Sequence, residues 1–155
     1  MKKNITPCLE QHLPEKAKPG NVVPPEAWFE AAAAHLASAR AITDADPSGA
    51  FMLGWESMHK TAKGVAGVGG ARLEGETHGK VVDFLCCVFE SLTTTEKGLV
   101  RRASTGRNSL SYDDPRLVDR RLCNDILALA AQLLAAARSG TQPKAARKIP
   151  PPPRA

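Results

Sequence analysis

Apolar side chains recur at intervals of three and four residues along most of this chain, which is the period of one face of an α-helix. The pattern predicts long helices over 24–42, 48–65, 75–89 and 116–138, and a short helix over 98–105. No run of alternating β-branched residues predicts a strand. The sequence therefore predicts an all-α fold, an up-down four-helix bundle with a short additional helix before the last long helix.

Residues that favour helix ends stand at several of the predicted boundaries. The prolines at 24–25 suit a first helical turn, and the loop over 43–47 contains acids that can cap the helix after it. Thr93 and Glu96 have the spacing of a capping box. Gly140 is typical of a residue that ends a helix.

Two central segments have an unusual composition. Residues 64–75 are rich in glycine and are predicted to be a flexible connection, because a phosphate loop would need a GK[ST] ending and a preceding strand. The run over 81–89 is apolar nearly all round. A helix of that kind is buried, so we expect it to be central or covered by a partner chain.

Both ends of the chain are predicted to be disordered. Residues 1–23 contain three prolines and little periodicity, which is typical of a mobile lead-in. Residues 140–155 form a basic, proline-rich tail without core-forming residues, and such tails are solubilising ends. Residues 24–139 are left as one domain, the helical bundle.

The net charge of +5 belongs to the ends rather than to the bundle. Residues 26–139 hold 13 Lys and Arg against 14 Asp and Glu, whereas the last 16 residues hold four basic residues and no acidic one. The basic character is therefore not that of a DNA-binding fold.

Hydropathy and cysteine spacing favour a cytoplasmic protein. No apolar run reaches the length of about 18 residues that a membrane span needs, and the N-terminus lacks the apolar core of a secretory signal. The four cysteines lack the spacing and the paired histidines of a zinc site. Cys86 and Cys87 lie in the apolar run and are predicted to be core thiols rather than disulfide partners. Neither a metal nor a cofactor is predicted.

One region within the bundle gathers basic side chains. Residues 97–121 hold seven Lys and Arg against three Asp, a surplus that can attract a polyanion in a salt-dependent way. The alternative is a solvated helix surface in which Asp119 relieves the neighbouring arginines. Elsewhere, Trp28 and Trp55 lie at helical spacing and are predicted to be core residues, and His78 is the histidine best placed to meet a ligand.

Arg107, Asn108 and Tyr112 form a short block of a guanidinium, an amide and a phenol, preceded by Arg101 and Arg102. Planar donors beside an aromatic ring hold phosphates and bases. Because five residues of one helix turn through a net angle of about 140°, Asn108 and Tyr112 share a face whereas Arg107 and Tyr112 do not. Arg107 and Tyr112 can meet on one ligand only if the helix breaks between them, or if two subunits bring their copies together.

Four short sequence patterns occur in order along the chain. Residues 31–39 carry a pattern of small residues and leucine, residues 50–62 place an aromatic before a lysine step, and residues 75–82 contain Thr-His-Gly. The block at 107–112 then falls where one family carries an Arg-x4-6-His motif. With these patterns in this order and spacing, residues 26–139 resemble a HEPN domain.

The resemblance implies a helical homodimer. In catalytic HEPN members the arginine and histidine of the motif are thought to meet at the dimer interface and cleave RNA without a metal. Many members are toxins paired with a small nucleotidyltransferase antitoxin, and others act in phage defence. Here Tyr112 stands where the histidine would be, and a phenol with a pKa of about 10 is a poor general base at neutral pH. The departure favours a binding protein over an enzyme.

The sequence thus predicts a HEPN-like protein that binds a nucleotide, RNA or a partner protein, in a bacterial defence or toxin–antitoxin-type module. Arg107 is predicted to grip phosphate, Asn108 to orient it or cap the helix, and Tyr112 to pack or hydrogen-bond beside it. The predicted site also includes Arg101, Arg102 and His78. The first alternative is a metal-independent endoribonuclease, and the second is a structural protein-interaction domain.

Overall fold

The computed structural model describes residues 1–12, 23–73, 78–112 and 118–143, with side chains for all of these except 107–112. Within the described residues the chain forms helices and no β-strand, so the predicted all-α class is confirmed. The helices are α1 (Lys2–His12), α2 (Pro25–Ile42), α3 (Pro47–Val68), α4 (His78–Val88), α5 (Thr94–Tyr112) and α6 (Arg120–Ser139). The predicted arrangement of four long helices and a short one is therefore too simple.

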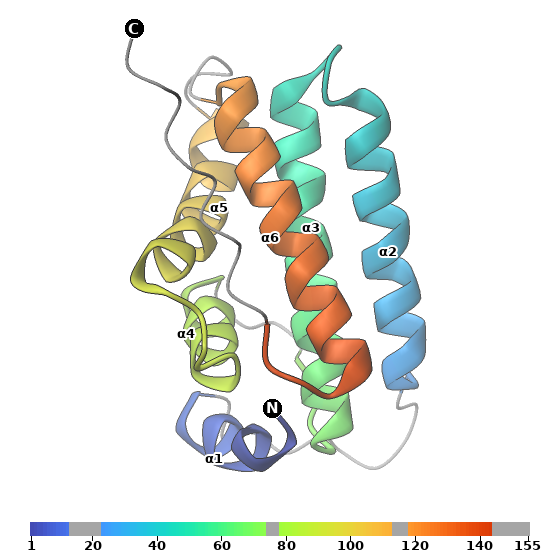
Figure 1. Cartoon of the computed structure of the whole chain (residues 1–155), viewed down its shortest axis with the longest axis vertical. Helices are drawn as coiled ribbons and strands as arrows, with labels where there is room; N and C mark the ends of the chain where they lie inside the picture. Colours follow the sequence, from blue (N-terminus) through green and yellow to red (C-terminus); the bar gives the residue numbers. More distant parts are fainter. Residues whose placement is uncertain (13–22, 74–77, 113–117, 144–155) are drawn as a thin grey trace, which may run out of the picture.

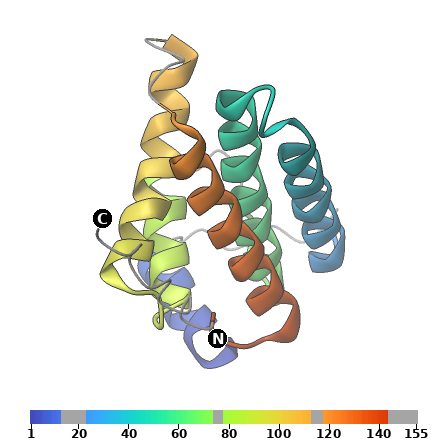
Figure 2. The same ribbon diagram turned by 45° about the horizontal axis from the view of Figure 1, so that its top comes forward.

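Helix α3 is the centre of the molecule. It contacts every other helix, and α2 and α6 run beside it (Figure 1). Helix α5 packs against α3, α4 and α6, and its last turns project beyond the ends of its neighbours (Figure 2). The largest fully buried side chains include Phe51, Trp55 and Met58, all from α3.

Helix α4 is covered by other parts of the same chain. Its buried residues are Val81, Val82, Phe84, Leu85 and Val88, and the helix contacts α1, α3 and α5. The apolar run is thus buried as predicted, but α3 rather than α4 is central. Because α1 and α5 supply the cover, the apolar character of α4 gives no support for a partner chain.

Side-chain caps fix the starts of three helices. The Asp46 carboxylate accepts a hydrogen bond from the Gly49 N–H at 2.8 Å and starts α3. The predicted capping box at α5 is confirmed, because Thr93 Oγ1 accepts from the Glu96 N–H at 3.2 Å and Glu96 Oε2 accepts from the Thr93 N–H at 2.8 Å. Asp119 accepts from the Leu122 N–H at 2.7 Å and starts α6.

Helix α1 was not predicted, and the expectation of a mobile lead-in is wrong for residues 2–12. Ile5, Cys8 and Leu9 follow one another at helical spacing and are buried, with α1 lying against α4 and α3. Three apolar positions in a polar segment are too few to predict a helix from the pattern alone. The expectations for residues 13–22 and for most of the C-terminal tail, residues 144–155, lie outside the described residues.

Three other helix boundaries differ from the predictions. Helix α3 continues through Gly64 to Val68. A Cβ at Gly64 would collide with the ring of Phe29, so the glycine serves the close packing of α2 on α3. Helix α5 continues to Tyr112 rather than ending near residue 105. Helix α6 begins at Arg120, later than predicted, and ends at Gly140, which has a φ of 67°.

The prediction that Cys87 is a core thiol is wrong. Cys87 on α4 forms a disulfide with Cys8 on α1, with their Cα atoms 5.8 Å apart. Cys86 and Cys123 are free thiols, and burial raises the pKa of both. The pairing partner of Cys87 lies 79 residues away in the unpredicted helix, so local spacing held no sign of it. None of the described helices combines the length and apolar composition needed to cross a membrane.

Candidate functional site

The block at 107–112 lies in the last turns of α5, which is helical from Thr94 to Tyr112. The helix does not break between Arg107 and Tyr112, so one of the two conditions for their convergence is not met. Within one chain the two positions stand about 140° apart around the helix axis. The remaining condition is a second subunit.

One row of positions on α5 faces the core. Glu96, Val100 and Ala103, spaced by four and three residues, are all buried. Position 107 is four residues further along and continues this row. Arg107 therefore lies on the side of α5 that, earlier in the helix, faces α3 and α6. It belongs to the last turns of α5, which project beyond the neighbouring helices (Figure 2).

A second row runs along the solvent side of the same helix. Lys97 is half-buried, and Arg101 and Thr105 are exposed. Positions 108 and 112 continue this row at helical spacing. The register thus places Asn108 and Tyr112 in line with Lys97 and Arg101, and separates them from Arg107. We call Lys97, Arg101, Thr105, Asn108 and Tyr112 the outer row of α5.

The outer row carries positive charge that α5 itself does not offset. The single acid of the helix, Glu96, is buried and accepts hydrogen bonds from Thr93 and from Gln132 Nε2, the latter at 3.4 Å. Arg102, which flanks the row, is exposed as Arg101 is. Within the described part of the chain, Lys97, Arg101 and Arg102 form no ion pair.

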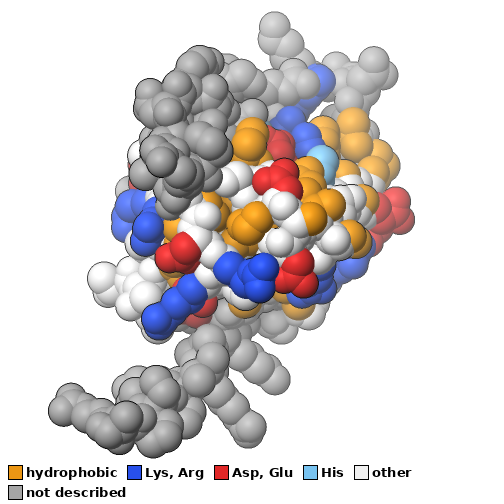
Figure 3. All heavy atoms as spheres, turned by 90° about the horizontal axis from the view of Figure 1, so that it is seen from above, with side chains coloured by type: hydrophobic (Ala, Val, Ile, Leu, Met, Phe, Trp, Pro, Cys, Tyr) orange, Lys and Arg blue, Asp and Glu red, His pale blue; other side chains and the backbone are white. Residues whose placement is uncertain are grey.

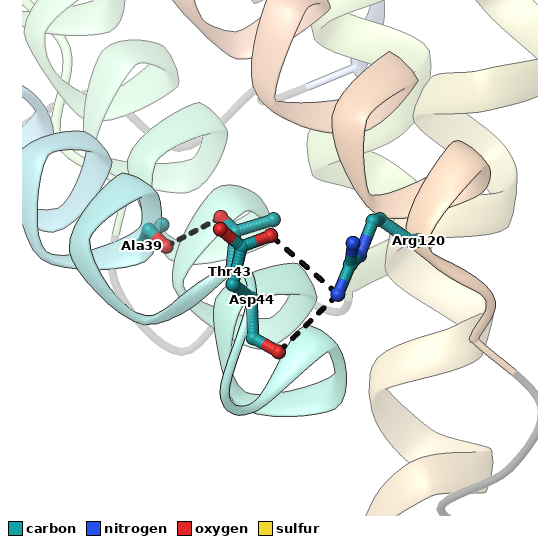
Figure 4. Close-up of polar contacts among 4 residues, drawn as sticks. All are labelled: Ala39, Thr43, Asp44 and Arg120. Atoms are coloured by element: carbon teal, nitrogen blue, oxygen red, sulfur yellow. Dashed lines mark hydrogen bonds and ion pairs between the residues drawn. The ribbon is translucent and has the colours of Figure 1, made fainter.

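One arginine of the basic region, Arg120, is already engaged by an acid. Arg120 Nη2 lies 3.5 Å from both the carbonyl oxygen and the carboxylate Oδ1 of Asp44, in the turn after α2 (Figure 4). Asp119 serves as the cap of α6. The alternative in which it relieves neighbouring arginines also concerns Arg116, which lies outside the described residues. The contact of Arg120 with Asp44 ties the first residue of α6 to the turn between α2 and α3.

Mixed charge also covers the end of the molecule that carries this turn. Seen from that end, lysines and arginines alternate with acids and hydrophobic side chains (Figure 3). A surface of that kind gives no single-sign field that would draw a polyanion. On α5, by contrast, Lys97, Arg101 and Arg102 lie within six residues of sequence.

His78 lies at the start of α4 and packs against α3. Its ring is 5.6 Å from the Trp55 ring and 5.9 Å from the His59 ring, centroid to centroid. Gly106 of α5 packs on Phe51, four residues before Trp55 on the same side of α3. His78 and Gly106, the residue before the block, therefore contact the same row of α3, about one to two helical turns apart, or roughly 6–11 Å.

His59 was not predicted as a site residue, and its surroundings differ from those of an exposed histidine. Burial lowers the pKa of His59 to about 4, against the opposing effect of the nearby Glu56 carboxylate, whose Oε2 lies 4.0 Å from His59 Nδ1. The imidazole is therefore neutral at pH 7. The described residues contain no group of three or more His, Cys, Asp or Glu arranged to hold a metal ion.

Trp28 is the other residue whose role differs from the prediction. Trp55 is fully buried as expected, but Trp28 is half-buried. The Nζ atoms of Lys63 and Lys60 lie 4.6 Å and 5.5 Å from the centroid of the Trp28 ring. The spacing of the two lysines, one turn apart on α3, was visible in the sequence, but which ring they would meet depends on how α2 packs on α3.

Comparison of the chain with protein-family models, with curated proteins and with solved structures finds no match. The HEPN resemblance therefore stays a prediction that rests on the four ordered sequence patterns.

Proposed function

We propose that this protein binds RNA or a nucleotide through the outer row of α5. The observation that carries the proposal is the contrast among its arginines. Arg120 and Arg138 are paired with Asp44 and Glu26 at 3.5 Å and 3.4 Å, whereas Lys97, Arg101 and Arg102 lack an ion pair within the described residues. Cations that the described residues leave without an ion pair, on a projecting helix, are the kind of surface that gathers phosphates.

Each residue of the row has a role in this proposal. Lys97 and Arg101 contact phosphates, and Arg102 adds charge beside them. Tyr112 stacks on a base or hydrogen-bonds to it, and Asn108 orients the same nucleotide. The row from 97 to 112 is about 22 Å long, which suits a strand of several nucleotides better than a lone phosphate. Arg107, on the core-facing row, joins the same ligand only if a second subunit supplies it.

The setting proposed from the HEPN resemblance is a homodimer in a bacterial defence or toxin–antitoxin-type module, with a nucleotidyltransferase or another antitoxin as its partner. The Cys8–Cys87 disulfide argues against the reducing cytoplasm expected from cysteine spacing, because disulfides persist in oxidising compartments. The proposed RNA binding does not depend on the compartment.

RNA binding is tested by the fluorescence anisotropy of a labelled single-stranded RNA titrated with the full chain. Arg101→Gln is expected to weaken binding by about tenfold, since one charge-assisted contact to phosphate contributes about 1.5 kcal/mol. Arg121→Gln is the matched control, because Arg121 is equally exposed but lies on α6. Equal affinities of the two variants would contradict the proposal.

A metal-independent endoribonuclease is the second candidate, favoured by the neighbouring rings of His59 and His78. The imidazole of His59 is unprotonated at pH 7, although a pKa of about 4 makes it a weaker general base than an ordinary histidine. Incubation of the protein with total RNA in EDTA separates the two candidates. Cleavage that His59→Gln and Arg107→Ala both abolish would support the nuclease, and intact RNA bound in a salt-dependent way supports the binding protein.

A further inference from the structure

Helix α1 lies at one end of the molecule, against α4 and α3 (Figure 1). Its buried aliphatic side chains are Ile5 and Leu9. Both pack on Gly69, directly after α3, where an added Cβ would collide with them. None of the largest fully buried side chains of the described chain belongs to α1. Helix α1 therefore rests on the core and does not form its centre.

One covalent bond adds to this small noncovalent contact. Cys8 of α1 is bonded to Cys87 of α4. Eleven residues lose backbone freedom when α1 forms and docks, and Pro7 within the helix lacks an N–H to donate. Burial of two aliphatic side chains does not offset that loss. The disulfide keeps the segment beside α4 even when the helix opens, so it decides whether α1 stays docked.

The end of α4 is held independently of α1. Gln142, in the segment after α6, donates from Nε2 to the carbonyl oxygen of Val88 at 2.9 Å. Ser91, in the turn after α4, donates from its hydroxyl to the carbonyl oxygen of Pro143 at 2.9 Å. Helix α4 also contacts α3 and α5. Loss of α1 therefore leaves α4 attached to the rest of the bundle.

The disulfide is open to a reductant from one side. Cys8 is 2% exposed, whereas Cys87 is half-buried. A thiolate therefore attacks Sγ of Cys87, forms a mixed disulfide there and displaces Cys8 as a thiolate, which takes up a proton. The second thiol of a dithiol then attacks the reductant's own sulfur and displaces Cys87, which is protonated in turn. The reductant leaves as a disulfide, and the protein has gained two thiols.

We propose that α1 is a redox-controlled strap. The Cys8–Cys87 disulfide holds it closed over α4, and a dithiol reductant releases it while α2 to α6 stay folded. In an oxidising compartment the strap stays closed, and in a reducing one it opens. Opening uncovers the surface of α4 around Cys87 and the end of α3 at Gly69. The proposal does not depend on the binding of RNA by α5.

Hydrogen exchange of the full chain, followed by mass spectrometry with and without dithiothreitol, tests the proposal. The oxidised protein should protect amides in residues 2–12. Under native conditions dithiothreitol should raise the free thiols, counted after quenching and unfolding, from two to four. Exchange in α1 should then approach that of an unfolded chain, while exchange in α3 and α6 stays unchanged. Reoxidation with oxidised glutathione should restore the protection of α1.

Two serine variants sharpen the test. Cys87→Ser should leave α1 unprotected with or without reductant, and α3 protected in both conditions. Cys86→Ser is the matched control, because Cys86 is the adjacent residue of α4 and a free thiol. It should respond to dithiothreitol as the wild type does. If Cys87→Ser fails to fold, Cys8→Ser replaces it, since it removes the same bond from the side of α1.

Four results would overturn the proposal. Two free thiols after native incubation with dithiothreitol would mean that the reductant does not reach the bond. Unchanged exchange in α1 after full reduction would mean that packing alone holds the helix. Loss of protection in α3 and α6 together with α1 would mean that the bond stabilises the whole bundle. Protection that does not return on reoxidation would mean that the release is not reversible.

Discussion

Gly106 of α5 lies against the ring of Phe51 in α3, so closely that a Cβ at position 106 would come within 2.8 Å of a ring carbon. Phe51 is fully buried and cannot move aside without disturbing the core. The contact comes one residue before Arg107 and fixes where the block at 107–112 leaves the body of the molecule.

Gly106→Ala tests this contact against Gly98→Ala on the same helix. A Cβ at Gly98 meets nothing within 4 Å, so alanine there should stabilise the protein by about 0.5–1 kcal/mol through its better helix propensity. At Gly106 the added methyl overpacks the core, and that variant should be about 1–3 kcal/mol less stable than Gly98→Ala. Urea unfolding of both variants measures the difference, and equal stabilities would show that the contact is not tight.

The capping box of α5 should contribute measurably to stability. Thr93→Ala removes the oxygen that accepts from the Glu96 N–H, and loss of such a cap costs about 0.5–2 kcal/mol. Thr95→Ala is the control, because Thr95 is exposed and makes no side-chain hydrogen bond within the described residues. Thermal unfolding followed by circular dichroism should rank Thr93→Ala below wild type and Thr95→Ala level with it. The reverse order would contradict the observed cap.

His59 should make the protein less stable in mild acid. Its pKa is lowered from 6.5 to about 4 in the folded state, mainly by burial. Between these two values the unfolded chain takes up a proton on His59 that the folded chain does not, so the free energy of unfolding falls as the pH falls. The full effect is up to about 3 kcal/mol, at about 1.4 kcal/mol for each pH unit between the two pKa values.

The measurement is urea unfolding of wild type and His59→Gln at several pH values across that window. Subtracting the two curves removes the carboxylates that titrate in both proteins. The wild type should lose more stability than His59→Gln as the pH falls from 6.5 to about 4. Parallel curves would mean that His59 has the same pKa in the folded and the unfolded chain.

The Cys8–Cys87 disulfide should hold α1 on α4. It closes a loop of 79 residues, for which chain entropy gives a stabilisation of about 4 kcal/mol. Helix α1 has 11 residues with Pro7 among them, and so short a helix is marginal without tertiary contacts. Reduction or Cys8→Ser should therefore lower the midpoint of unfolding and increase amide hydrogen exchange in residues 2–12.

Counting thiols provides the control for that experiment. Protein that was unfolded without a reductant should show two free thiols, Cys86 and Cys123, and four after reduction. Four free thiols before reduction would show that the disulfide does not form. Unchanged exchange in α1 after reduction would show that packing of Ile5 and Leu9 holds the helix without it.

The parts of the fold that could be predicted are those fixed by local chemistry. Thr93 and Glu96 specify the start of α5 within four residues of sequence, and Gly140 specifies the end of α6. Helix α1 could not be predicted in this way, because its three apolar positions form a buried face only when α4 packs against them. The prediction that a flexible connection begins at Gly64 was wrong for a similar reason. The glycine lies within α3 and makes room for the ring of Phe29 from α2.

The residues of the candidate site were named from the sequence, but their arrangement around α5 was not. Helical geometry already separated Arg107 from Tyr112 in the sequence, but only the continuous course of α5 to Tyr112 shows that a single chain keeps them apart. Which side of the helix faces solvent follows from the burial of Val100 and Ala103. Once the solvent side of α5 is identified, Lys97 joins the candidate site and Arg107 lies on the other row.

The salt dependence of RNA binding tests the outer row of α5 most directly. Affinities of wild type and of Lys97→Gln/Arg101→Gln for a single-stranded RNA are measured between about 50 mM and about 200 mM salt. If the two side chains contact two phosphates, the double variant should lose about 1.4 from the slope of log affinity against log salt concentration. Lys3→Gln/Arg121→Gln should keep the wild-type slope. Equal slopes for the two double variants would contradict the proposal that RNA lies along α5.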